Sequence, residues 1–131
     1  MADITAVIGR EKYKMTITSS HGNTLIADEP RHLGGEDLGF SPFELLASSL
    51  GTCTAATMRM YSDRKKWELE QVTVRVSVER DDKADKASFV RYIEMKGNLD
   101  KEQCARLLEI ADKCPIHRTL EGKIEIETIA N

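Results

Sequence analysis

The fold is decided by residues 41–66, which read SPFELLASSLGTCTAATMRMYSDRKK. Ser41 is a good capping residue, Pro42 suits the first helical position, and Glu44 places an acid in the first turn. The cations at positions 64–66 suit the last turn, where the helix dipole favours positive charge. The stretch therefore predicts one long helix over residues 42–66.

This predicted helix carries no charge on any side between residues 45 and 58. Such a helix must be buried on nearly all sides, but a single small sheet can cover only one of them. We therefore expect a second copy of the chain to cover the other side. The uncharged run is shorter than the roughly 20 apolar residues that a membrane span needs, so it reads as a buried core helix.

Strands are predicted on both sides of the helix. Before it, three short segments with β-branched residues are separated by turn signals, and a loop rich in glycine and proline follows them. After it, valines alternate with polar residues, and a charged loop leads to a returning strand. The expected strands are residues 4–8, 13–18, 23–28, 72–78 and 89–96, with loops over 29–42 and 79–86.

The end of the chain predicts a second helix and a last strand. The helix begins near Leu99 and repeats apolar residues at spacings of three and four, and the strand alternates Ile124 and Ile126 with glutamates. The whole order is β-β-β-α-β-β-α-β. This order predicts an α+β fold with an antiparallel sheet against one long helix.

Length and charge limit the classes of function. The 131 residues are enough for one compact domain, so we expect a single domain over residues 1–131. The 19 basic and 22 acidic residues are nearly balanced, with no basic run that could neutralise a row of phosphates, which argues against a nucleic-acid partner. The first residues contain an acid and no apolar run of signal-peptide length, so we expect a cytoplasmic protein with no membrane attachment.

The three cysteines are the candidate reactive groups. Cys53 lies among small residues, so a small reagent could reach its sulfur, although most helix cysteines are small buried hydrophobes and its spacing alone favours that reading. Cys114 precedes Pro115 at a predicted helix start and is followed by His117 and an arginine, a setting that favours the thiolate. It could also be a packed residue at a helix junction. Cys104 lies on the apolar face of its helix, where we expect it to pack.

A metal or nucleotide site is not expected. Cys53, Cys114 and His117 could together supply three metal ligands, but one Cys-x-x-His pair lacks the repeated spacing of zinc modules. Gly34 and Gly35 lack the lysine and hydroxyl of a phosphate-binding loop. We therefore expect no bound cofactor.

Three segments taken together resemble the osmotically inducible protein C and organic hydroperoxide resistance family. They are Leu33-Gly34-Gly35, residues 41–53 and residues 114–122, and the similarity extends over nearly the whole chain. The resemblance implies an intertwined homodimer, in which the sheets wrap around two long central helices and the active sites lie between the subunits.

The resemblance also implies a chemistry. Members of the family reduce organic hydroperoxides to alcohols. The residue matching Cys53 attacks the peroxide, and the one matching Cys114 resolves the resulting sulfenic acid as a disulfide, which a dithiol reductant reopens. The family uses an arginine that supports the thiolate, for which Arg10 is the candidate and Arg31 the alternative. Arg31, Glu44 and His117 are possible supporting residues.

The chain departs from the family pattern at one position. A family glutamate directly follows the helix-opening proline, but here Phe43 occupies that place and the acid comes next, as Glu44. Glu44 is about 180° around the helix from Cys53, so we interpret it as a first-turn acid that complements the helix dipole. The missing glutamate motivates a second hypothesis, a non-catalytic dimeric module that binds a small apolar or thiol-bearing molecule.

Overall fold

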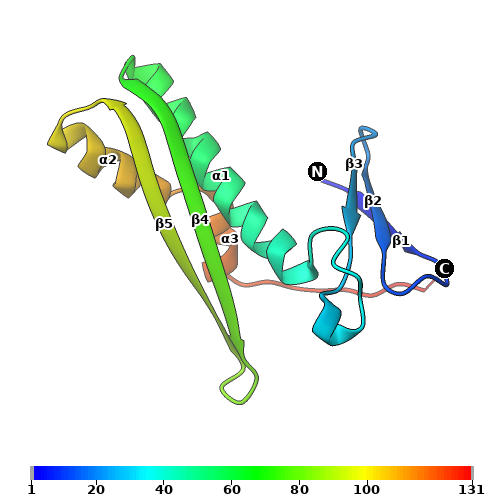
Figure 1. Cartoon of the computed structure of the whole chain (residues 1–131). Coiled ribbons are helices and arrows are strands. Elements are labelled where there is room, and N and C mark those ends of the chain that lie inside the picture. Colours follow the sequence, from blue (N-terminus) through cyan, green and yellow to red (C-terminus); the bar gives the residue numbers. More distant parts are fainter. Residues whose placement is uncertain (1, 131) are drawn as a thin grey trace. The chain divides into compact units, whose positions relative to one another are not determined.

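The computed structural model describes residues 2–130, which divide after Leu46 into two compact units (Figure 1). Strands, one 3₁₀ helix and three α-helices follow each other in the order β1 (Ile4–Ile8), β2 (Met15–Ser19), β3 (Thr24–Ala27), η1 (Arg31–Leu33), α1 (Pro42–Lys65), β4 (Glu68–Asp81), β5 (Lys86–Asn98), α2 (Lys101–Ala111) and α3 (Pro115–Glu121). All strand pairs in the two sheets are antiparallel. The predicted α+β class is therefore confirmed, with two sheets in place of one.

The N-terminal unit is built on the sheet β1-β2-β3. Its register pairs Ile4 with Ser19 and Met15 with Ala27, so the predicted meander is confirmed with small shifts at the strand ends. Every residue of β1 is exposed in the chain as described. The loop that follows β3 is long and has only η1 as regular structure, as the sequence predicts.

A buried carboxylate organises this loop. The side chain of Asp28, which is 1% exposed, accepts hydrogen bonds at Oδ1 from the backbone N–H groups of Tyr13 (3.3 Å) and Glu29 (2.7 Å). Its Oδ2 accepts from those of Glu36 and Leu38, both at 3.2 Å. Burial alone would raise the pKa of this carboxyl, but the four hydrogen bonds outweigh it and hold the pKa below its ordinary value of 3.8.

Two glycines let the loop fold back onto the chain that precedes it. A Cβ on Gly35 would lie 1.9 Å from the carbonyl oxygen of Glu29, and one on Gly39 would lie 2.2 Å from that of Ile26. No other residue fits so close an approach. The loop then returns to β3, because Phe40 forms a parallel bridge with Ala27.

The helix start is closed by a capping box. The hydroxyl of Ser41 accepts from the backbone N–H of Glu44 at 3.2 Å, and the carboxylate of Glu44 accepts from the backbone N–H of Ser41 at 2.9 Å. The helix ends at Lys65, since Lys66 has a positive φ of 60°. The long helix predicted over residues 42–66 is thus confirmed to within one residue.

The C-terminal unit contains the long hairpin β4–β5 (Figure 1). Both predicted strands are confirmed, but they are longer than the valine pattern indicates. The pairing continues through Arg80 with Ala87 and Asp81 with Lys86, so half of the charged stretch predicted as a loop is strand. Backbone hydrogen bonds form the extension. They do not require apolar side chains, so the hydrophobic pattern of the sequence does not reveal them.

Helices α1 and α2 pack against one face of this hairpin. That face carries half-buried valines from β4 at positions 72, 74, 76 and 78. The buried core joins Met58 of α1 and Leu69 of β4 to Leu107 and Ala111 of α2. Met58 and Leu107 are fully buried, which stabilises the fold by about 1.5–3 kcal/mol for each side chain.

The structure corrects one predicted element. Residues 123–130 have no regular secondary structure, so the last strand expected at Ile124 and Ile126 is not formed in the described chain. Alternation shows only that a segment could present one apolar face, and a strand also needs a partner. Both isoleucines are exposed, at 57% and 88%. None of the helices in the described part of the chain is long and apolar enough to cross a membrane.

The Asp28 carboxylate generates a first prediction. Asn in its place would turn an NH₂ group toward two of the four N–H donors, so Asp28→Asn should lower the urea midpoint at neutral pH. Because the folded-state pKa lies below 3.8, the wild-type advantage is present above that pH and is lost as the pH falls through the folded-state value. Urea unfolding followed by circular dichroism from pH 7 to pH 3 measures both effects. A midpoint difference that did not shrink in acid would contradict this account.

Candidate active site

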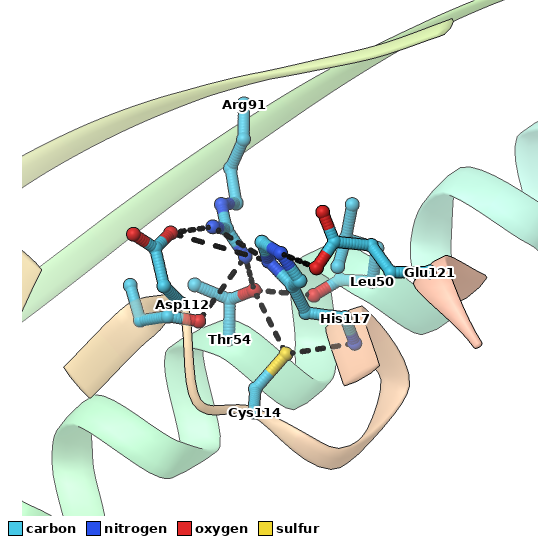
Figure 2. Close-up of polar contacts among 8 residues, drawn as sticks. Leu50, Thr54, Arg91, Asp112, Cys114, His117 and Glu121 are labelled. Carbon is cyan, nitrogen blue, oxygen red and sulfur yellow. Dashed lines mark hydrogen bonds and ion pairs between the residues drawn. The ribbon is translucent and has the colours of Figure 1, made fainter. Parts of the chain in front are cut away.

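Two of the predicted site residues come from segments that meet in the C-terminal unit. Cys53 is half-buried on α1, and the residue after it, Thr54, has its hydroxyl oxygen 3.6 Å from the sulfur of Cys114. Cys114 is 0% exposed, and both thiols are free. The turn of α1 that carries Cys53 therefore contacts the start of α3 that carries Cys114 (Figure 2).

Cys114 is the N-cap residue of α3, as its position before Pro115 predicts. Its backbone is extended, and its sulfur accepts a hydrogen bond from the backbone N–H of His117 at 3.3 Å. Pro115 fits the first helical position because its missing N–H would have no partner there. The sulfur thus lies between a backbone donor and a hydroxyl, inside the protein.

The centre of the site is Arg91, a residue that the sequence analysis does not identify. Its Nη1 donates to the hydroxyl of Thr54 at 3.0 Å and to the carbonyl of Ala111 at 3.2 Å. Its Nη2 donates to Asp112 at 2.7 Å and lies 3.1 Å from Nδ1 of His117. The side chain is 12% exposed, so one guanidinium joins β5, α1, the end of α2 and α3 (Figure 2).

The contacts of His117 define its tautomer. A guanidinium can only donate, so Nδ1 of His117 must accept from Arg91 and the ring proton must be on Nε2. Nε2 lies 3.0 Å from a carboxylate oxygen of Glu121. The ring of His117 therefore lies between Arg91 and Glu121, while its backbone N–H donates to the sulfur of Cys114.

One signal in the sequence could have identified Arg91. The inward face of β5 consists of the half-buried Phe89, Arg91, Ile93 and Met95, and Arg91 pairs with Val76 on β4. A charged residue at an apolar position of a period-two strand is rarely buried without a partner. The charged residue at position 91, on a strand face that is otherwise apolar, was therefore the signal in the sequence that could have identified Arg91.

The remaining residues that the sequence analysis named belong to other elements of the chain. Arg10 is in the turn between β1 and β2, and Arg31 is in η1, so both belong to the N-terminal unit. Their support of the Cys53 thiolate stays a prediction. The carboxylate of Glu44 caps α1 through Ser41, and Cys104 is half-buried on α2.

The alternative of a metal site receives no geometric support. Among residues 2–130, no group of three His, Cys, Asp or Glu side chains is arranged to hold a metal ion. Cys53, Cys114 and His117 therefore do not form the three-ligand cluster considered from the sequence. The described residues instead include a half-buried thiol, Cys53, on the helical turn whose next residue contacts the buried thiol of Cys114.

Comparison with known proteins gives a consistent result. A family model described as OsmC-like protein matches residues 34–129. A hydroperoxide reductase from Mycoplasma pneumoniae is 24% identical over 135 residues, which cover 98% of this chain and 93% of that protein. These findings confirm the resemblance drawn from the sequence, and the relative's name supports peroxidase-type function at the level of the family.

Solved structures show the same fold. The crystal structure of an OsmC-like protein from Mycoplasma pneumoniae matches with a TM-score of 0.79 and 24% identity, over 93% of this chain and 88% of that one. An organic hydroperoxide resistance protein OsmC from Legionella pneumophila gives 0.71 and 24%, over 93% and 90%. OhrB of Bacillus subtilis, an organic hydroperoxide resistance protein, gives 0.64 and 22%, over 93% and 91%.

The unequal burial of the cysteines generates a second prediction. In the reduced native protein, iodoacetamide should modify Cys114 last, because its sulfur is 0% exposed while Cys53 and Cys104 are half-buried. In urea the three should react at similar rates. Peptide mass spectrometry over a time course measures each site. Native labelling of Cys114 as fast as that of Cys53 would contradict the burial described.

Proposed function

Because this chain belongs to the OsmC-like protein family, we propose that it is a cysteine-based peroxidase that reduces organic hydroperoxides to alcohols. The observation that carries the proposal is the contact between Thr54 and the sulfur of Cys114, which brings the helical turn of Cys53 against the second thiol. Two thiols in neighbouring segments, one accessible and one buried, suit a cycle of oxidation and disulfide formation.

In the first step the thiolate of Cys53 attacks the terminal oxygen of the hydroperoxide. A sulfur–oxygen bond forms, the O–O bond breaks, and the alkoxide takes a proton to leave as the alcohol. Cys53 becomes a sulfenic acid, so the sulfur is oxidised as the peroxide is reduced. The half-buried position of Cys53 supports this role, since a reagent can reach it before Cys114.

In the second step Cys114 condenses with the sulfenic acid. Its sulfur attacks that of Cys53, a disulfide forms, and the departing hydroxide combines with the thiol proton as water. A dithiol reductant then reopens the disulfide by thiol exchange and is itself oxidised. The cycle balances without a bound cofactor.

The surroundings of Cys53 support an organic substrate. Residues 45–58 carry no charge, and this scarcity of charge around the thiol suits an organic hydroperoxide better than a highly polar one. We further propose that Arg10, or alternatively Arg31, supports the Cys53 thiolate, as the family resemblance implies.

The third prediction tests the enzyme. With a small dithiol present, the wild-type protein should consume cumene hydroperoxide faster than hydrogen peroxide. Cys53→Ser should abolish consumption, because the attacking sulfur is gone, and Cys114→Ser should form no intramolecular disulfide after Cys53 is oxidised. Cys104→Ser is the matched control and should retain wild-type turnover. The assay follows loss of peroxide, with mass spectrometry of the oxidised protein.

The outcomes of this assay separate the two hypotheses. A Cys53→Ser protein that turned over at the wild-type rate would overturn the proposed mechanism. A wild-type protein that consumed neither peroxide would instead favour the non-catalytic binding module, and ligand binding would then have to persist when both cysteines are serine.

We also propose that the chain forms a homodimer through α1. The helix buries one stripe, Ala47, Leu50, Thr54, Met58 and Ser62, while the opposite side is exposed at Thr52, Ala56 and Met60. Met60 is 68% exposed. A side with small residues at i and i+4 allows two helices to approach closely, so a second copy of α1 suits it.

The fourth prediction concerns this dimer. The wild-type protein should sediment at twice the chain mass of 14.7 kDa, and Ala56→Glu should shift it toward the monomer by placing a charge in the helix contact. Ala105→Glu, at an exposed position of α2, is the matched control and should leave the mass unchanged. A monomeric wild-type protein at micromolar concentration would contradict the proposal.

A further inference from the structure

We propose that Arg91 is a positioning residue for the resolving step, because it orients the hydroxyl of Thr54 toward the sulfur of Cys114 and fixes the corner between α2 and α3. This inference rests on the proposed function, since it assigns a role within the same cycle. It concerns the closing of the disulfide and leaves the attack on peroxide unaffected.

The position of the guanidinium supports this role. One nitrogen of Arg91 joins Thr54 to the carbonyl of Ala111, and the other joins Asp112 to His117 (Figure 2). These contacts bracket Cys114, which follows Ala111 and Asp112 and precedes His117 in the chain. The residues that hold the resolving thiol are therefore attached to one side chain.

The hydroxyl of Thr54 can serve both protonation states of the sulfur. Arg91 always donates to this oxygen, and in one arrangement the hydroxyl hydrogen points to the carbonyl of Leu50 at 2.7 Å. The remaining lone pair can then accept from the thiol of Cys114, 3.6 Å away. When the thiol loses its proton, the hydroxyl can turn and donate to the sulfur, while the bond from Arg91 is kept.

The contacts of Arg91 direct its effect to the second step. Three of them go to residues near Cys114 in the chain, Ala111, Asp112 and His117, and the fourth goes to the hydroxyl of Thr54, which contacts the Cys114 sulfur. Attack of the Cys114 sulfur on the sulfenic acid of Cys53 forms the S–S bond, breaks the S–O bond and releases water. The rate of this attack depends on how the sulfur of Cys114 is presented, and a misplacement of about 1 Å can cost a hundredfold.

Packing against the neighbouring strand residues alone does not require an arginine at this position. Its neighbours on the same face of β5, Phe89 and Ile93, are apolar, and so is Val76 opposite it. Removing a guanidinium from water is costly, and buried ionic groups can often be replaced by apolar residues of similar volume without loss of stability. The side chain gains four polar contacts here, all of them around the resolving thiol.

The fifth prediction separates the two chemical steps in a single turnover. Reduced protein is mixed with one equivalent of cumene hydroperoxide, and quenched samples are analysed by mass spectrometry for sulfenic acid, trapped with dimedone, and for disulfide. In Arg91→Gln the oxidation of Cys53 should keep its wild-type rate, while disulfide formation slows by about tenfold or more, the effect expected from losing hydrogen bonds to a charged group. Sulfenic acid should accumulate in this variant. When further peroxide is then added, it should convert the sulfenic acid to sulfinic acid.

Further variants make the test specific. Arg91→Lys should recover part of the closing rate because it keeps a donor, and Thr54→Val should slow closing while leaving the arginine and its other contacts in place. Arg75→Gln is the matched control, since Arg75 is exposed on the other face of the same hairpin, over the ring of Tyr92, and should behave as wild type.

The experiment distinguishes failure of the role proposed for Arg91 from failure of the proposed peroxidase function. Disulfide closing at the wild-type rate in both Arg91→Gln and Thr54→Val would overturn this inference while the peroxidase itself stands. Equal slowing of both steps in the two variants would assign them a general structural role and would also overturn it. A wild-type protein whose Cys53 is not oxidised at all would overturn the proposed function and this inference with it.

Discussion

The structure depends on one constraint, a long helix that carries no charge between residues 45 and 58 and that buries only one stripe against its own chain. The buried stripe of α1 meets the β4–β5 hairpin and α2 at a core that includes Met58 and Leu107. The opposite side, with Ala56 and Met60, is exposed. The same uncharged sequence that makes α1 a core helix also places Cys53 in apolar surroundings. Folding, the proposed association and the proposed substrate preference thus have one physical origin.

Two buried charges organise the irregular parts of the chain in complementary ways. Asp28 accepts four backbone hydrogen bonds and holds the loop after β3, whereas Arg91 contacts four polar groups on or at the ends of three helices and holds the corner before α3. Each joins several polar groups from separate segments through one charged side chain. Loops fixed in this way can carry functional residues without regular secondary structure of their own.

Much of the fold could be predicted because its signals are local. Ser41, Pro42 and Glu44 act within one turn, and the valines of β4 alternate within one strand. The last strand was wrong for the opposite reason, since alternation at Ile124 and Ile126 cannot show whether a partner strand exists. The extension of the hairpin to Asp81 was missed because backbone pairing continues beyond the apolar residues.

Of the candidate site, the sequence pointed to Cys53, Cys114 and His117 but not to Arg91. Arg91 is 37 residues from Thr54 and 26 from His117 in the chain, so no sequence motif joins them, and only the charge on an apolar strand face pointed to it.

Burial supports an order of events that a list of reactive residues could not give. Peroxide must reach a sulfur before it can be reduced, and Cys114 is fully buried while Cys53 is half-buried. Cys114 is also already engaged, through Thr54 and the N–H of His117, before any oxidation. In the proposed cycle the more accessible thiol, Cys53, is oxidised first. Cys114 is held in the same protein and does not have to diffuse to the sulfenic acid, so it can form the disulfide before a second peroxide reacts. The value of burying Cys114 would therefore lie in the speed of the second step.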